Sequence, residues 1–313
     1  MSALSLSDMQ SYLSRSISSL NQNKLNGILA EIEFREYLRS IGFADKVSPG
    51  GWIIRSKGVG NFGHHTVALF PETITPDASY PAGRTLPDPS TGLHTICSTF
   101  HAIGIQSFFC APEVRREHDS TSVAWKCKHL GLPTDQPFGE FTFAGFNERD
   151  RRYNFLRYGT DVSTIPHHAI PGQFTKENLR VSFASIYIAE ISDIDGVFWG
   201  RQYTYPIEIK EKTAATDSGM GEYFGLDLGP FVKLAYYAAK KGNLHSIFVV
   251  KEIENTETRR IRNWWFIRYD QIAQYGSWVP SGGGTSMMGS ASTVVKIPKS
   301  EFTLLNEDSL NSL

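Results

Sequence analysis

Alternation of apolar and polar positions predicts a β-hairpin in the second half of the chain. Residues 193–199 (Asp-Ile-Asp-Gly-Val-Phe-Trp) and 205–212 (Tyr-Pro-Ile-Glu-Ile-Lys-Glu-Lys) are both rich in β-branched and aromatic side chains, which favour strands. The glycine and polar residues between them are typical of a turn. Because successive side chains of a strand point to opposite faces, Glu208 and Lys210 share one face and the neighbouring isoleucines share the other.

This hairpin holds a carboxylate and an ammonium group side by side, and Asp195 on the neighbouring strand can reach the same place. Mg²⁺ prefers oxygen ligands, usually one or two carboxylates with water and phosphate. Asp195 and Glu208 supply such carboxylates, while Lys210 can orient or deprotonate water or stabilise charge on a phosphate. Since Glu-x-Lys is a common tripeptide, charges on the wet face of a hairpin are the alternative interpretation.

A period of 3.6 residues predicts a helix from about Asn23 to Gly42. Glu31 lies within its apolar stripe, which consists of Leu25, Ile28, Phe34, Leu38 and Ile41. A carboxylate on a buried face is costly unless it is paired or close to a metal. Glu31 is therefore a candidate functional residue, and a glutamate at the edge of the buried face is the alternative.

The spacing Gly27-x-x-x-Glu31, followed by Gly42 and a strand at 51–55, resembles the opening helix and strand of the PD-(D/E)xK nucleases. In that family an Asp follows on the second core strand and a Glu-x-Lys on the third. Asp195 and Glu208-Ile209-Lys210 match those positions. Asp193 shares a strand face with Asp195, so either can be the ligand, and we favour Asp195 because it leads directly into an apolar run.

A predicted helix at 231–241 and a buried strand at 246–251 continue the family's order of elements, so that the resemblance covers residues 21–57 and 184–254. It implies an α/β (α+β) fold with a restriction-endonuclease-like core, a mixed central sheet flanked by helices. About 125 residues separate the first and second core strands, too many for a loop in a compact domain. We therefore expect nuclease core at 1–57, an insertion at 58–180 for DNA recognition, and the remaining core with the C-terminal strands at 181–313.

The insertion has elements of its own, with strands predicted at 66–70, 105–110, 122–127 and 140–145 and a helix at 93–103. It also contains an arginine-rich segment among aromatic residues, in which the arginines are Arg149, Arg151, Arg152 and Arg157. Arginine beside aromatic side chains suits contacts to phosphates and bases. We expect this segment to bind DNA, and a solvated charged turn or helix is the alternative.

Two further patterns concern the cysteines of the insertion and a glycine-rich segment near residue 285. Cys97, Cys110 and Cys127, with nearby histidines, can be arranged into a zinc site, but their spacing matches no standard zinc finger and favours buried thiols. Residues 281–290 are rich in glycine and are predicted to form a flexible loop, because they lack the lysine and following helix of a phosphate-binding loop.

The composition limits how the chain can interact with nucleic acids and membranes. The 313 residues are 41% hydrophobic and 20% charged with a net charge of −1, so a nucleic acid would have to be met by local basic patches. No stretch approaches the roughly 18 apolar residues of a membrane span, and none is of signal-peptide type. Three cysteines are an odd and sparse set, which fits a cytoplasmic location.

The resemblance implies an Mg²⁺-dependent endonuclease that hydrolyses phosphodiester bonds in double-stranded DNA, as type II restriction enzymes do. It implies a homodimer that leaves 5′-phosphate and 3′-hydroxyl ends. Asp195 and Glu208 would hold the metal, Glu31 would support it, and Lys210 would act on water. A structure-specific or defence nuclease of the same fold and a catalytically silent DNA-binding protein are the alternatives.

Overall fold

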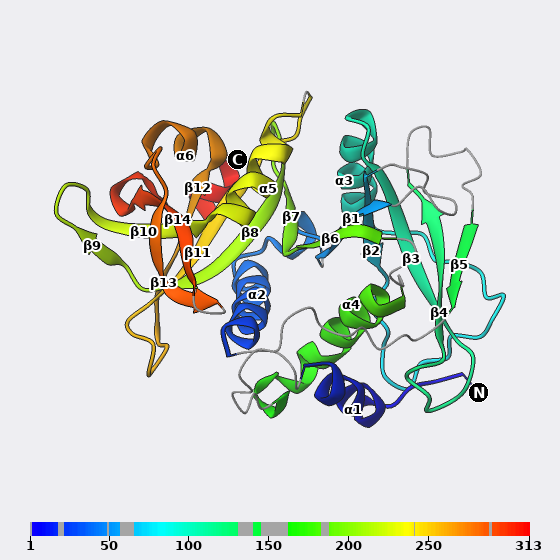
Figure 1. Cartoon of the computed structure of the whole chain (residues 1–313). Coiled ribbons are helices and arrows are strands. Elements are labelled where there is room, and N and C mark those ends of the chain that lie inside the picture. Colours follow the sequence, from blue (N-terminus) through cyan, green and yellow to red (C-terminus); the bar gives the residue numbers. More distant parts are fainter. Residues whose placement is uncertain are drawn as a thin grey trace. The chain divides into compact units, whose positions relative to one another are not determined.

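The chain has an α+β fold with mixed sheets. A computed structural model describes residues 2–17, 22–48, 50–56, 66–130, 140–144, 162–182, 188–240, 242–287 and 290–313. The chain forms two compact units (Figure 1). The first consists of residues 1–25 and 48–194, and the second consists of 26–47 and 195–313.

The first unit is built on a six-stranded sheet in the order β5-β4-β3-β2-β1-β6. Its strands are β1 (Gly51–Ser56), β2 (Thr66–Pro71), β3 (Gln106–Val114), β4 (Val123–His129), β5 (Glu140–Ala144) and β6 (Ile188–Ile194). Strands β2 and β3 are parallel, and the other neighbours are antiparallel. Its helices are α1 (Leu6–Ile17), α3 (Thr91–Ala102) and α4 (Ile170–Ser182).

The core of the first unit joins these helices to the sheet. Phe100 of α3 stacks on Phe70 of β2, with ring centroids 6.2 Å apart. Trp125 of β4 donates a hydrogen bond from its indole nitrogen to the side-chain oxygen of Asn178 in α4, at 3.1 Å. Because buried polar groups need partners, this bond allows a tryptophan and an asparagine to lie inside the core.

The second unit contains a five-stranded sheet in the order β15-β12-β11-β8-β7 and a four-stranded sheet in the order β13-β14-β10-β9. The first comprises β7 (Gly196–Trp199), β8 (Thr204–Lys212), β11 (Ile247–Ile253), β12 (Ile261–Arg268) and β15 (Thr303–Leu304). The second comprises β9 (Ala215–Asp217), β10 (Gly221–Asp227), β13 (Ser281–Met287) and β14 (Ser290–Pro298). Its helices are α2 (Gln22–Ser40, whose first turn is assigned to the first unit), α5 (Leu228–Ala238), α6 (Tyr269–Tyr275) and α7 (Glu307–Asn311).

The five-stranded sheet is covered on both faces. Phe34 and Leu38 of α2 pack with Ile207 and Ile209 of β8 on one face. On the other face, residues of β11 pack with Leu234 of α5 and with strands of the four-stranded sheet. Each fully buried side chain of this size contributes about 1.5–3 kcal/mol. Strand alternation then places Glu208 and Lys210 on the face of β8 that α5 covers.

The structure confirms the predicted hairpin as β7 and β8, the predicted helix at 23–42 as α2, and the strands predicted in the insertion as β2 to β5. The predicted strand at 51–55 is present as β1, but it is hydrogen-bonded to β2 and β6 in the six-stranded sheet, so it does not share a sheet with Glu208. The prediction of a flexible loop at 281–290 is wrong for residues 281–287, which form the strand β13 hydrogen-bonded to β14.

The compact units also divide the chain differently from the ranges 1–57, 58–180 and 181–313. Because β1 pairs with β2, the strands of the expected insertion share one sheet with β1, the strand predicted to open the core. Most of α2 belongs to the second unit because its apolar stripe packs on β8.

Candidate active site

Asp195 lies beside the Glu208-Ile209-Lys210 segment in the second unit. Gly196 is paired with Ile207 in the antiparallel hairpin, so Asp195 falls opposite Glu208. The backbone N–H of Ile209 donates a hydrogen bond of 2.8 Å to Asp195 Oδ2. Asp195 is 3% exposed, and this bond satisfies one of its oxygens and fixes the carboxylate. Asp195, which immediately precedes β7, is therefore held beside Glu208 and Lys210 of β8.

Glu208 is paired with two lysines. Its Oε1 lies 2.5 Å from Lys210 Nζ, and its Oε2 forms an ion pair with Lys233 of α5. The Glu208 side chain is only 2% exposed, whereas those of Lys210 and Lys233 are 33% and 14% exposed. A buried carboxylate costs several kcal/mol unless it is paired. The two ammonium groups therefore stabilise Glu208 and hold it in place.

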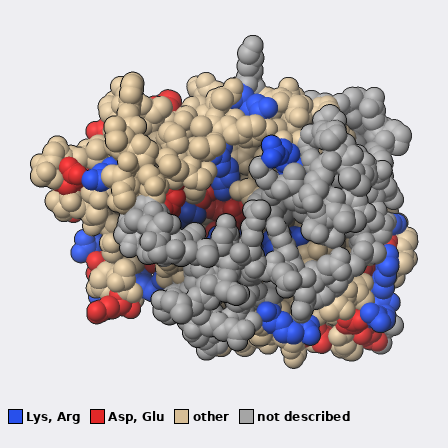
Figure 2. All heavy atoms as spheres, in the orientation of Figure 1, with Lys and Arg blue, Asp and Glu red and all other residues tan. Residues whose placement is uncertain are grey.

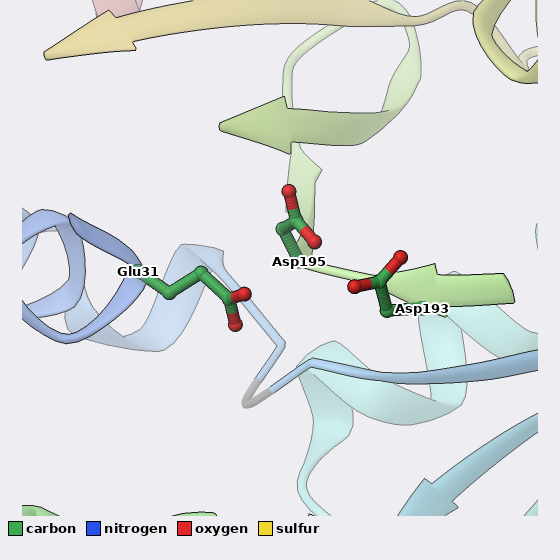
Figure 3. Close-up of side chains that lie close together, drawn as sticks. All are labelled: Glu31, Asp193 and Asp195. Atoms are coloured by element: carbon green, nitrogen blue, oxygen red, sulfur yellow. The ribbon is translucent and has the colours of Figure 1, made fainter. Parts of the chain in front are cut away.

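Glu31, Asp193 and Asp195 form a group of carboxylates that can hold a metal ion (Figure 3). Each offers an oxygen, and these oxygens lie within 4.8 Å of one another. Glu31 comes from α2, and Asp193 comes from the end of β6, two residues before Asp195. Among the described residues, this is the group of His, Cys, Asp or Glu side chains close enough for a shared ion. Oxygen ligands of this kind suit hard divalent cations.

The predicted metal ligands are therefore only partly brought together. Glu31 and Asp195 belong to the group, and Asp193 joins them, so the choice between Asp193 and Asp195 is replaced by both. Glu208 is not in the group, because its two oxygens face Lys210 and Lys233. In this structure Glu208 orients lysines.

Sequence analysis missed two residues at this site. Arg35 Nη2 lies 3.3 Å from Glu31 Oε2 and donates a hydrogen bond of 3.1 Å to the backbone oxygen of Asp195, which ties α2 to the start of β7. Its position one turn after Glu31 is the spacing at which helix side chains meet. Lys233 is the one charged residue within α5, and an isolated charge in an apolar helix is a signal that a buried partner exists.

Lys212 extends the charged face of β8 beyond Lys210. Burial lowers the pKa of its ammonium group, and Lys210 lowers it further, while Asp227 opposes this effect. The distance from Lys212 Nζ to Asp227 Oδ2 is 4.0 Å. Three ammonium groups, those of Lys210, Lys212 and Lys233, thus accompany the Glu208 carboxylate.

Other predicted site residues lie elsewhere. Arg149, Arg151, Arg152 and Arg157 are outside the described residues. Cys97, Cys110 and Cys127 are buried, and burial raises the pKa of the Cys97 and Cys110 thiols. In the part of the chain that the structure describes, they form no metal group with histidines.

On the face that Figure 2 shows, Lys and Arg side chains are dispersed among Asp and Glu side chains. This distribution agrees with the net charge of −1. Within the described ranges, no helix is both long enough and apolar enough to cross a membrane.

Comparisons with protein-family models, with curated proteins and with solved structures find no match to this chain. The function is therefore inferred from the chemistry of the carboxylates and lysines at this site.

Proposed function

We propose that the chain is an Mg²⁺-dependent endonuclease that hydrolyses phosphodiester bonds in double-stranded DNA, a PD-(D/E)xK enzyme similar to type II restriction endonucleases. The observation that carries this proposal is the hydrogen bond from the Ile209 N–H to Asp195 Oδ2. It fixes an acidic side chain against the middle of a Glu-x-Lys segment, which is the combination that the resemblance rests on.

The order of elements in the second unit supports the proposal. Helix α2 is followed in that unit by β7, β8, β9, β10, α5 and β11, and β8 and β11 run parallel. Strands β9 and β10 belong to the four-stranded sheet. Without these two strands, the order is the helix, strand, strand, helix, strand part of the order that resembles the nuclease core. The departure is β1, which belongs to the six-stranded sheet.

The carboxylate group fits Mg²⁺. Glu31, Asp193 and Asp195 would hold it, because three carboxylates this close repel one another unless a cation accompanies them. Bound Mg²⁺ would polarise a phosphoryl oxygen and lower the pKa of water. Arg35 would keep Glu31 and the Asp195 backbone in register.

Lys210 would act on the reacting groups. Its side chain is one third exposed while Glu208 holds its ammonium group at 2.5 Å, so it can orient a water molecule or stabilise charge on phosphate oxygens. In the hydrolysis, the water oxygen bonds to phosphorus and the bond from phosphorus to the 3′ oxygen breaks. The 3′ oxygen takes up a proton, leaving a 3′-hydroxyl and a 5′-phosphate.

The proposed partners are a second copy of the chain and double-stranded DNA. Cleavage of both strands at a palindromic site would need two copies of the chain, as in the homodimer that the resemblance implies. The arginines between 149 and 157 are proposed to contact DNA, because guanidinium groups match phosphate and guanine geometry.

Incubation of the purified protein with bacteriophage DNA of known sequence tests the proposal. With Mg²⁺ we expect discrete fragments, and with EDTA we expect intact DNA. A Mg²⁺-dependent smear would retain the nuclease and reject sequence specificity. Intact DNA with every divalent metal, from protein shown to be folded, would contradict the proposal unless nicked or branched substrates are cut.

A further inference from the structure

Lys251 of β11 joins α2 to the five-stranded sheet through two ion pairs. Its Nζ lies 2.5 Å from Glu33 Oε2 of α2 and 3.2 Å from Glu211 Oε2 of β8. The Lys251 side chain is 3% exposed, whereas that of Glu33 is 43% exposed. Arg259 is a second partner of Glu211, at 2.7 Å. One buried cation is thus shared by a helix and a neighbouring strand.

The contact lies on the face of the sheet that α2 covers. Lys251 points to the same face as Val249, which belongs to the same apolar cluster as Phe34 of α2. Lys251 is paired in register with Glu211 of β8, and Glu211 shares the strand face of Ile209, another member of that cluster. The two ion pairs therefore adjoin the apolar interface between α2 and the sheet.

Glu31 and Glu33 flank the apolar stripe of α2 on opposite sides. Ala30 and Phe34, one turn apart, belong to the cluster that packs on the sheet. Successive residues of a helix are about 100° apart around its axis. Glu31 follows Ala30 and is therefore turned to one side of the stripe. Glu33 precedes Phe34 and is turned to the other side, so contacts of the two glutamates restrain α2 from both sides.

Each of these glutamates has a polar contact that opposes rotation of α2. Arg35 joins Glu31 to the backbone oxygen of Asp195, and Lys251 holds Glu33. Apolar packing is non-directional, so the stripe alone does not fix the angle of the helix about its axis. Glu31 is one of the three carboxylates of the candidate metal site, and such sites tolerate displacements of only about 0.5 Å. The angle of α2 therefore decides whether the site is complete.

We propose that Lys251 is a positioning residue for the candidate metal site. It acts through Glu33 and holds α2 at the angle that brings Glu31 to Asp195. The inference rests on the proposed function, because it takes Mg²⁺ as the ion of the carboxylate group. It gives a role to a lysine whose ion-pair partners, Glu33 and Glu211, lie outside that group.

The test is the affinity of Lys251→Met for Mg²⁺ and Mn²⁺, measured by isothermal titration. Removal of a positive charge would by itself leave cation binding unchanged or make it tighter. We expect the opposite, an affinity loss of about 10–100-fold, as found for groups that orient metal ligands. An unchanged or increased affinity in folded Lys251→Met would overturn the inference.

Lys299→Met is the matched control. Lys299 also bridges a buried and an exposed carboxylate, those of Glu252 and Glu222. In each variant the buried carboxylate keeps one partner, because Trp265 still donates to Glu252 and Arg259 still pairs with Glu211. We expect Lys299→Met to bind the metal like the wild type. An equal loss of affinity in both variants would show that any lost bridge weakens the site and would also reject the inference.

Glu33→Gln tests the same contact from the helix and decides the inference if Lys251→Met does not fold. It should weaken metal binding in the wild-type background and have no further effect in Glu31→Gln, because residues that act through one another are not additive. Equal losses in both backgrounds would contradict the inference. A wild type that binds the metal but cuts no DNA would contradict the proposed function alone, and one that binds neither Mg²⁺ nor Mn²⁺ would overturn both.

Discussion

The Asp195 carboxylate accepts a hydrogen bond from the backbone of Ile209, at 2.8 Å. Ile209 itself points into the core with α2, so the residue between Glu208 and Lys210 anchors the segment in two ways. Its side chain packs on one face of the sheet, and its N–H fixes the acidic residue of the neighbouring strand. A carboxylate held in this way needs no reorganisation before it binds a cation.

Asp195→Asn should strongly reduce the cleavage rate without unfolding the chain. The amide oxygen can still accept from Ile209, but the negative charge is lost, so we expect the cleavage rate to fall by about 10²–10³-fold. Single-turnover cleavage and the melting temperature are the measurements, with Asp193→Asn beside it. If Asp195→Asn cleaves at nearly the wild-type rate, Asp195 is not an essential ligand. Comparison of its cleavage rate with that of Asp193→Asn shows which of the two aspartates contributes more to cleavage.

Glu31→Gln should weaken metal binding. It removes one of the three carboxylates that lie within 4.8 Å of one another, and we expect an affinity loss of about 10–100-fold, as found for groups around metal sites. Isothermal titration with Mg²⁺ or Mn²⁺ measures this. Glu36→Gln, on the same helix but outside the carboxylate group, serves as the control, and equal affinities in both variants would place the ion elsewhere.

Glu252 should make the stability of the second unit depend on pH. Burial alone would raise the pKa of this carboxyl, but hydrogen bonds from Lys299 and Trp265 lower it below its ordinary value of 4.5. A depressed folded-state pKa means that the stabilisation is present above the ordinary value and is lost as pH falls through the folded-state value.

The measurement is denaturant unfolding of the wild type and Glu252→Gln at neutral pH and at about pH 3, where such stabilisation is being lost. We expect the variant to be less stable at neutral pH and the difference to shrink in acid, because protonated glutamate resembles glutamine. A difference that stays constant would show that the charge of Glu252 contributes nothing.

Local sequence patterns predicted where helices and strands lie better than they predicted which strands pair with each other. The period of α2 and the alternation of β8 are properties of short segments, and both were found where expected. The pairing of β1 depends on β2 and β6, and β6 is more than a hundred residues away, which no short pattern records. In the same way, residues 281–287 become a strand only because β14 lies beside them.

The same difference between local and long-range contacts applies to the residues of the candidate site. Asp195 and Glu208 could be placed together because a hairpin joins them. Lys233 could not, because its contact with Glu208 depends on how α5 packs on the sheet. The grouping of Glu31 with Asp193 and Asp195 likewise depends on packing of α2.

The most direct measurement of the central claim is cleavage by Lys210→Ala under conditions in which the wild type cuts DNA with Mg²⁺. We predict that this variant loses cleavage while its binding of the same duplex in EDTA persists, and that Lys240→Ala cuts like the wild type. Retained cleavage by folded Lys210→Ala would contradict the assignment of the Glu208-Ile209-Lys210 segment as the active site. DNA binding with no cleavage by the wild type itself would favour a catalytically silent DNA-binding protein.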